Sequence, residues 1–318
     1  MVRPLKTAII VGSEGQDGRL LFDRLRDDGW IVLGVGRDCA RVSSGQPEFF
    51  DIASIIEVAR VFEQMNPDAV FYLPAVHASA DTSIDEGSDS IFRRSLDVHV
   101  QFAVNFLEVM SVRRSDAAFF YAGSSHVFAG AKVERQTELT PLAPDSIYGI
   151  TKAAGIQACR FYRSRKGVRA SAGILYNHES HLRGPGFVSQ RIVNAAVRAS
   201  RGEGEKLALG DLSACVDWGY APDYVDAMIR ISELPDADDY IIATGQPHTV
   251  REFVEEAFEC VGLDWHDFVI EQPSLLARRP SPLVGDYTRL NERIGWHPTV
   301  SFRELVRRMV DHARKNAA

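Results

Sequence analysis

Short apolar runs alternate with amphipathic stretches along the first half of the chain. Residues 7–11 form an apolar run without polar alternation, and similar runs recur at residues 30–35, 69–73, 117–121, 168–175 and 240–243. Residues 17–28 carry leucines at helical spacing, and residues 91–110 form a longer helical stretch. Apolar strands separated by helices predict a parallel sheet that helices cover on both faces. Right-handed crossovers then give an α/β fold of the doubly wound Rossmann type.

The regular alternation ends after residue 177, where loops, short helices and most of the later arginines follow. We expect residues 1–177 and 239–244 to form the Rossmann domain that binds the cofactor. Residues 178–238 and 245–318 are expected to form a smaller, discontinuous substrate-binding lobe. Such a lobe would cover the C-terminal edge of the sheet, where ligands bind in open α/β folds.

Composition and net charge limit the classes of partner that we expect the protein to bind. The chain has 318 residues and a net charge of −7, which argues against nucleic acid or an anionic membrane as a partner. The four cysteines are far apart, so we expect reduced thiols in a cytoplasmic protein, with neither a disulfide frame nor a metal site. The first residues contain no signal-peptide core, and no apolar run reaches the roughly 18–20 residues that span a bilayer.

A glycine-rich turn follows the first predicted strand and opens the first helix. Its glycines allow a tight turn and let the backbone approach a pyrophosphate at the helix N-terminus. The turn therefore predicts a dinucleotide cofactor, with candidate binding residues Gly12, Gly15, Gln16, Asp17 and Gly18.

The end of the second strand bears on which dinucleotide is bound. Arg37 stands where NAD-preferring enzymes place an acid, and an arginine suits the 2′-phosphate of NADP(H). Asp38 comes next in the chain and keeps NAD(H) open. Asp51 and Ile52 follow the expected third strand and are candidates for the adenine pocket. An N-cap role for Asp51 before the next helix explains it equally well.

Tyr148 and Lys152 are one helical turn apart and so share one face of a predicted helix. A cation beside a phenol favours the phenolate, which can exchange a proton with a substrate hydroxyl near neutral pH. Ser124 follows the apolar run at residues 117–121. Together with the phosphate-binding turn, these residues predict a nicotinamide-dependent enzyme that acts on sugars.

With these residues placed, the chain resembles the extended short-chain dehydrogenase/reductases and, more narrowly, the GDP-mannose 4,6-dehydratases. The resemblance covers nearly the full length. It rests on strings such as Gly-Gln-Asp-Gly at 15–18, Pro-Asp-Ser-Ile-Tyr at 144–148, Asn-His-Glu-Ser at 177–180, Asp-Trp-Gly at 217–219 and Val-Arg-Glu-Phe at 250–253. It implies a Rossmann domain with a nucleotide-sugar lobe, and NADP(H) as the cofactor.

The resemblance also implies roles for single residues. Tyr148 would be the base at the sugar C4 hydroxyl, and Lys152 would hold the nicotinamide ribose and lower the pKa of the tyrosine. Ser124 replaces a catalytic threonine. Further residues would surround the cofactor, namely Leu73, Ala75, Leu175 and Asn177. Others would contact the nucleotide sugar, namely Asn177, Glu179, Val188, Arg191 and Arg279.

Two positions depart from the dehydratase pattern. His126 stands where the family has the glutamate that removes the C5 proton, and Val216 replaces an arginine before Asp-Trp-Gly. Imidazole titrates near neutral pH, so His126 could take over the proton transfer. It could equally mark a change to keto-sugar reduction or epimerisation, or be a packing residue.

The sequence thus predicts an NADP-dependent 4,6-dehydratase of a nucleoside-diphosphate sugar, most simply GDP-mannose or another GDP-hexose. A GDP-4-keto-6-deoxyhexose reductase or epimerase is the alternative within enzymes, and a non-catalytic NADP(H)-sensing module is the alternative outside them. His77 and His99 are expected to be packing residues. The resemblance further implies a homodimer or tetramer, in which the helix at 91–110 and the helix that starts near Tyr148 pair with their mates in a four-helix interface. The apolar stripe of the first helix comprises Phe92, Leu96, Val100, Val104 and Leu107.

Overall fold

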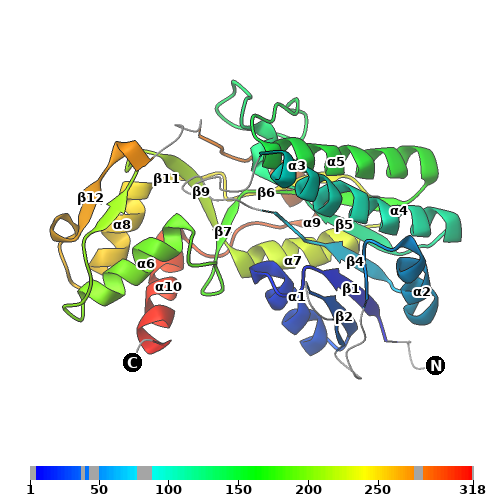
Figure 1. Ribbon diagram of the computed structural model, residues 1–318, viewed down its shortest axis with the longest axis horizontal. Coiled ribbons are helices and arrows are strands. Elements are labelled where there is room, and N and C mark those ends of the chain that lie inside the picture. The colour runs from blue at the N-terminus through cyan, green and yellow to red at the C-terminus, as the bar shows by residue number, and fades with distance from the viewer. Residues whose placement is uncertain (1–4, 37–39, 43–49, 77–87, 276–281, 317–318) are drawn as a thin grey trace.

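The fold is built on a seven-stranded sheet in the order β10-β6-β5-β4-β1-β2-β3 (Figure 1). The computed structural model describes residues 5–36, 40–42, 50–76, 88–275 and 282–316. Six strands are parallel, each within a residue of a predicted run: β1 (Thr7–Val11), β2 (Ile31–Val35), β4 (Ala69–Tyr72), β5 (Ala118–Ala122), β6 (Arg169–Leu175) and β10 (Asp239–Ile242). The predicted doubly wound α/β fold is confirmed.

The edge strand β3 (Ala40–Val42) differs from the prediction, because it runs antiparallel to β2. Its register pairs Val35 with Ala40 and Leu33 with Val42. A parallel neighbour needs a crossover of about a dozen residues. The chain between Val35 and Ala40 is far shorter, so it can only reverse direction. The prediction of a wholly parallel sheet is wrong at this edge.

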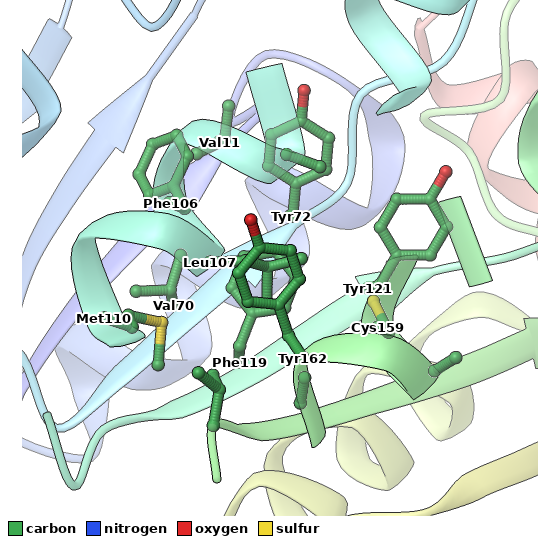
Figure 2. Close-up of a cluster of buried hydrophobic side chains, with 14 of the residues drawn as sticks. Val11, Val70, Tyr72, Phe106, Leu107, Met110, Phe119, Tyr121, Cys159 and Tyr162 are labelled. Atoms are coloured by element: carbon green, nitrogen blue, oxygen red, sulfur yellow. The ribbon is translucent and has the colours of Figure 1, made fainter. Parts of the chain in front are cut away.

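Helices cover both faces of the sheet, as the apolar runs predicted. One face carries α2 (Ile55–Met65), α4 (Phe102–Arg113) and α5 (Ile147–Lys166), and the other carries α1 (Gln16–Asp27), α7 (Ala221–Ser232) and α9 (Thr288–Ile294). Figure 2 shows the core under α4 and α5, where Phe106 and Leu107 pack with Phe119 and Tyr121 of β5. Burying one such side chain contributes about 1.5–3 kcal/mol.

The long helix predicted over residues 91–110 is divided. It consists of α3 (Ser88–Leu96), a π-helical turn η1 (Asp97–Gln101) and α4. Within the predicted interface stripe, Leu107 is fully buried against the sheet. It belongs to a second apolar stripe, Ala103, Phe106, Leu107 and Met110, whose spacing faces the core. The stripe prediction is wrong for Leu107, and its other four members are half-buried.

A further part of the fold lies beyond the sheet, where α6 (Val188–Ala199), α8 (Val250–Glu259) and α10 (Phe302–Asn316) gather beside short strands (Figure 1). The strands are β7 (Asn177–Glu179), β8 (Leu207–Leu209), β9 (Cys215–Tyr220), β11 (Pro247–Thr249) and β12 (Val269–Glu271). It has its own hydrophobic core, in which Trp218 is buried. The remaining short helices are η2 (Ser125–Phe128), η3 (Trp265–Asp267) and η4 (Pro273–Leu275). Both α7 and α9 fall within the ranges predicted for the lobe but pack on the main sheet. The domain bounds stay a prediction.

No helix in the described ranges is both long enough and apolar enough to cross a membrane.

Candidate active site

The turn between β1 and α1 is too tight for a side chain at Gly12 or Gly18. Gly12 has a φ of +84°, which an L-residue rarely adopts. A Cβ on Gly18 would lie 2.2 Å from the Gly12 carbonyl oxygen, so α1 packs directly on the turn. Gly15 is the N-cap and provides no side-chain capping bond, and Ser13 Oγ is buried with no hydrogen-bond partner among the described residues. A helix N-terminus with such a bare turn fits a dinucleotide pyrophosphate.

Gln16 and Asp17, the other predicted residues of this turn, direct their side chains toward β7. Gln16 Nε2 donates to the His178 carbonyl at 3.0 Å, and Asp17 lies 2.9 Å from His178 Nε2. The cofactor turn is thereby attached to the Asn-His-Glu-Ser segment. No local sequence pattern indicates this contact, because Asp17 and His178 are 161 residues apart.

The four candidate catalytic residues come together at the carboxyl ends of β4 and β5. Ser124 caps η2, accepting a hydrogen bond from the His126 backbone N–H at 3.3 Å. Tyr148 lies in the first turn of α5, and its ring centroid is 5.6 Å from that of His126 in an edge-to-face arrangement. Lys152 follows one turn later, with Nζ 6.0 Å from the Tyr148 ring centroid. Ser124, His126, Tyr148 and Lys152 thus form one compact cluster.

Burial governs the protonation of this cluster. Burial raises the pKa of Tyr148 above its ordinary value, while a hydrogen bond with Ser124 and the charge of Arg183 oppose the rise. Burial lowers the pKa of Lys152 to about 7. Lys152 Nζ donates to the Ala122 carbonyl at 2.8 Å and to the Pro74 carbonyl at 3.0 Å. The ammonium is therefore held by the strand ends, and Arg183 is a cation near Tyr148 that the prediction had not included.

His99 is a further residue that the sequence analysis placed only as packing. It lies in the π-helical turn, fully buried, with its ring centroid 5.5 Å from that of Tyr148. The Val76 backbone N–H donates to His99 Nε2 at 2.8 Å, so Nδ1 carries the proton and donates to Thr151 Oγ1 at 2.7 Å. Burial lowers the pKa of His99 to about 2, which keeps it neutral. His99 thus ties the segment after β4 to the catalytic helix.

Other predicted cofactor residues lie around the same edge. Leu73 is half-buried and Ala75 exposed after β4, and Leu175 ends β6. Asp51 is exposed and accepts a hydrogen bond from the Ala53 N–H at 2.9 Å. The N-cap of α2 is Ser54, so the alternative N-cap role for Asp51 is wrong. Ile52 packs at the margin of the sheet core.

The predicted substrate residues occupy β7 and α6. Asn177 begins β7 and is half-buried. Glu179 is buried and accepts from Ser189 Oγ at 2.8 Å. Val188 begins α6, and Arg191 Nη2 donates to the Ala208 carbonyl at 2.9 Å.

Some predictions fall on residues that the structure does not describe, namely Arg37, His77 and Arg279. Within the described ranges, no three His, Cys, Asp or Glu side chains group as a metal site. Val216, which replaces the family arginine, pairs with His248 across β9 and β11.

A Rossmann sheet, a glycine turn and a Tyr-x-x-x-Lys pair beside a serine together define an extended short-chain dehydrogenase/reductase, a class of NAD(P)-binding enzymes. The sequence model described as GDP-mannose 4,6 dehydratase matches residues 9–309. The chain belongs to the GDP-mannose 4,6-dehydratase family and is a nucleotide-sugar enzyme. This membership sets aside the non-catalytic sensing module.

Individual relatives are consistent with this family assignment. GDP-mannose 4,6 dehydratase 1 of Arabidopsis thaliana is 33% identical over 98% of this chain and 90% of its own length. The UDP-glucose 4-epimerase of Thermotoga maritima superposes with a TM-score of 0.82 at 23% identity, covering 98% of this chain and all of the other. The RMD protein of Pseudomonas aeruginosa, solved with NADPH, has a TM-score of 0.81 at 19% identity, covering 98% and 99%. The two structures support the fold alone.

Proposed function

We propose that this protein is a GDP-mannose, or closely related GDP-hexose, 4,6-dehydratase that produces a 4-keto-6-deoxy sugar. The observation that carries the proposal is the gathering of Ser124, His126, Tyr148 and Lys152 in one cluster at the carboxyl edge of the sheet. We infer the identity of the substrate, a GDP-sugar, from the family of the chain and from its relatives.

Each residue of the cluster has a defined task. Tyr148 Oη takes the proton of the C4 hydroxyl as that carbon is oxidised, and Ser124 hydrogen-bonds the reacting oxygen. Lys152, fixed to two carbonyl oxygens, would hold the nicotinamide ribose through its ammonium. A nicotinamide cofactor would supply the hydride chemistry that links oxidation at C4 with reduction at C6. Arg183 and Ser124 favour the phenolate of Tyr148 against the effect of burial.

The middle step requires a group that moves protons beside C5 and C6. The C4 ketone acidifies the C5 hydrogen, so a base can remove that proton while the C6 hydroxyl leaves as water after protonation. We assign this task to His126, whose ring lies edge-to-face with the ring of Tyr148. A histidine in place of the family glutamate also favours a second candidate function, reduction or epimerisation of a GDP-4-keto-6-deoxyhexose.

The test is to incubate the purified enzyme with GDP-mannose and a small amount of NADP+, without reductant. A dehydratase regenerates its own cofactor and accumulates 4-keto product well beyond the amount of NADP+. A reductase or epimerase of a GDP-4-keto-6-deoxyhexose would instead leave GDP-mannose unchanged, because its keto-sugar substrate is not supplied. Unchanged GDP-mannose, together with turnover of a supplied GDP-4-keto-6-deoxyhexose, would replace the dehydratase assignment by the second candidate.

The nucleotide sugar is proposed to bind between β7 and α6, in the lobe that we predict within residues 178–238 and 245–318. Asn177, Val188 and Arg191 lie on these elements, and Arg279 is proposed to face the diphosphate. Because Val216 removes a family arginine, Arg191 and Arg279 carry more of the diphosphate charge here. A cytoplasmic location fits such a substrate.

We further propose NADP(H) as the preferred cofactor, because Arg37 follows the second strand where its charge would meet a 2′-phosphate. Arg37→Ala is expected to weaken NADP+ binding by about tenfold and to change NAD+ binding little, since the lost contact is one charge-assisted hydrogen bond. Dissociation constants of both cofactors measure this. A wild type that prefers NAD+, or an unchanged preference in Arg37→Ala, would contradict the assignment.

A homodimer through α4 and α5 is proposed from the family resemblance. Large apolar side chains of these helices are exposed, including Val112, Ile150 and Phe161. Phe161→Asp is expected to convert the dimer to a monomer at micromolar concentration, because a buried unpaired carboxylate opposes association. Sedimentation velocity measures the change, and Ile270→Asp on the distant β12 is the matched control. A monomeric wild type would contradict the proposal.

A further inference from the structure

A histidine and an aspartate join the cofactor turn to the substrate side of the molecule. His178 Nε2 lies 2.9 Å from Asp17 Oδ2 and 3.0 Å from Oδ1, and His178 Nδ1 lies 2.6 Å from the Tyr176 carbonyl oxygen. A carbonyl oxygen can only accept, so Nδ1 carries a hydrogen. The ionised carboxylate also only accepts, so Nε2 carries one as well. The hydrogen-bond geometry therefore fits an imidazolium paired with a carboxylate.

The surroundings of the pair support this protonation state. Burial lowers the pKa of His178, but the charge and hydrogen bond of Asp17 outweigh it and hold that pKa above its ordinary value. Burial raises the pKa of Asp17, but His178 lowers it to below the ordinary value. The other groups facing His178 are Arg183, which follows β7, and Tyr224 of α7, whose ring stacks on the imidazole at 4.5 Å. The carboxylate of Glu179 compensates the charge of Arg183, with Oε2 lying 3.1 Å from Arg183 Nε.

The position of Asp17 at the start of α1 explains why the charge of this pair matters for cofactor binding. Asp17 is the second residue of α1, in the helical turn where a dinucleotide pyrophosphate binds. An unpaired carboxylate there would repel two phosphates. The same segment is held by neutral contacts, because Gln16 Nε2 donates to the His178 carbonyl and Ser180 Oγ donates to Gln16 Oε1 at 2.9 Å. The charged pair is therefore not needed merely to hold the two segments together.

We propose that His178 is a positioning residue whose imidazolium neutralises Asp17 and fixes the first turn of α1 for the cofactor pyrophosphate. The proposal rests on the dinucleotide site of the proposed function, but not on the sugar or the reaction. It links cofactor affinity to a residue of the substrate side, so the Asn-His-Glu-Ser segment serves both ligands.

The test compares NADP+ dissociation constants, by calorimetry, among wild type, His178→Gln, Asp17→Asn and the double variant. We expect His178→Gln to bind NADP+ at least about tenfold more weakly than wild type, because the variant leaves an unpaired buried carboxylate beside the phosphates. Asp17→Asn removes the carboxylate that the imidazolium neutralises, so it should weaken binding less than His178→Gln does. The double variant should recover to within about threefold of wild type, since the two effects are coupled. The exposed pair Asp264 and His266, 2.7 Å apart, supplies the control His266→Gln, which should bind as wild type does.

The pH dependence gives a second readout that needs only wild type and the double variant. The raised pKa of His178 means that the pair is fully present below the ordinary imidazole pKa and is lost as pH rises through the folded value. As pH rises from below the ordinary imidazole pKa, wild-type affinity should therefore fall relative to the double variant. A parallel profile, or a double variant as weak as His178→Gln, would overturn the proposal. A His178→Gln variant that binds NADP+ as tightly as wild type would also overturn it.

Discussion

Replacing Tyr148 by phenylalanine is expected to lower the rate of NADP+ reduction by about 10²–10⁴-fold, the usual contribution of a general acid or base. The variant removes only Oη, which the mechanism uses to take the C4 hydroxyl proton. The ring remains, so its edge-to-face packing with His99 and His126 is retained. Single-turnover absorbance of NADPH after mixing with GDP-mannose measures the step.

Cofactor affinity should change little in Tyr148→Phe, because the glycine turn and Lys152 hold the dinucleotide in the proposed site. Tyr162 is the matched control on the same helix, since its hydroxyl donates to Glu108 at 2.8 Å and serves no chemistry. Tyr162→Phe should reduce NADP+ at the wild-type rate. Substantial NADPH formation by Tyr148→Phe would remove the tyrosine from its assigned role.

The second large effect concerns His126, the residue that departs from the family pattern. His126→Ala is expected to lose C5 proton removal by about 10²-fold or more while C4 oxidation persists, because only the middle step uses the imidazole. Wild type in deuterated water should incorporate deuterium at C5, and His126→Ala should not. Mass spectrometry of the sugar nucleotide follows both reactions.

His126→Glu supplies the matching rescue, because it restores the residue type of the family. It should recover elimination if the position holds the C5 base. An active enzyme whose C5 exchange is the same in His126→Ala as in wild type would make His126 a packing residue. Absence of elimination in wild type, with its appearance in His126→Glu, would favour the reductase.

The elements that the sequence predicted are those that depend on local patterns. The six parallel strands were visible because a strand buried on both faces has no polar alternation. The glycine turn and the Tyr148–Lys152 spacing are likewise local, so their placement at the carboxyl edge followed from the fold. The direction of β3 was missed because it depends on the short connection after Val35, which the apolar pattern does not encode.

The unpredicted parts of the site depend on distant contacts. His99 was interpreted as packing because a histidine on an apolar helix carries no signal, and the π-helical turn around it has no sequence signature. The pair of His178 with Asp17 and the effect of the Arg183 charge on Tyr148 both connect segments that are distant in the sequence. Lys152 shows the same limit, because its spacing predicted proximity to Tyr148 but not the two carbonyl oxygens that hold its ammonium.

The central claim is that one active site oxidises C4 and reduces C6 of the same sugar. The most direct measurement supplies GDP-mannose deuterated at C4 to the wild-type enzyme with a small amount of unlabelled NADP+. The account predicts a 4-keto product that carries the deuterium at C6, because the hydride removed from C4 is returned within one site. Deuterium that accumulates in NADPH, or a product that keeps its 6-hydroxyl, would contradict it.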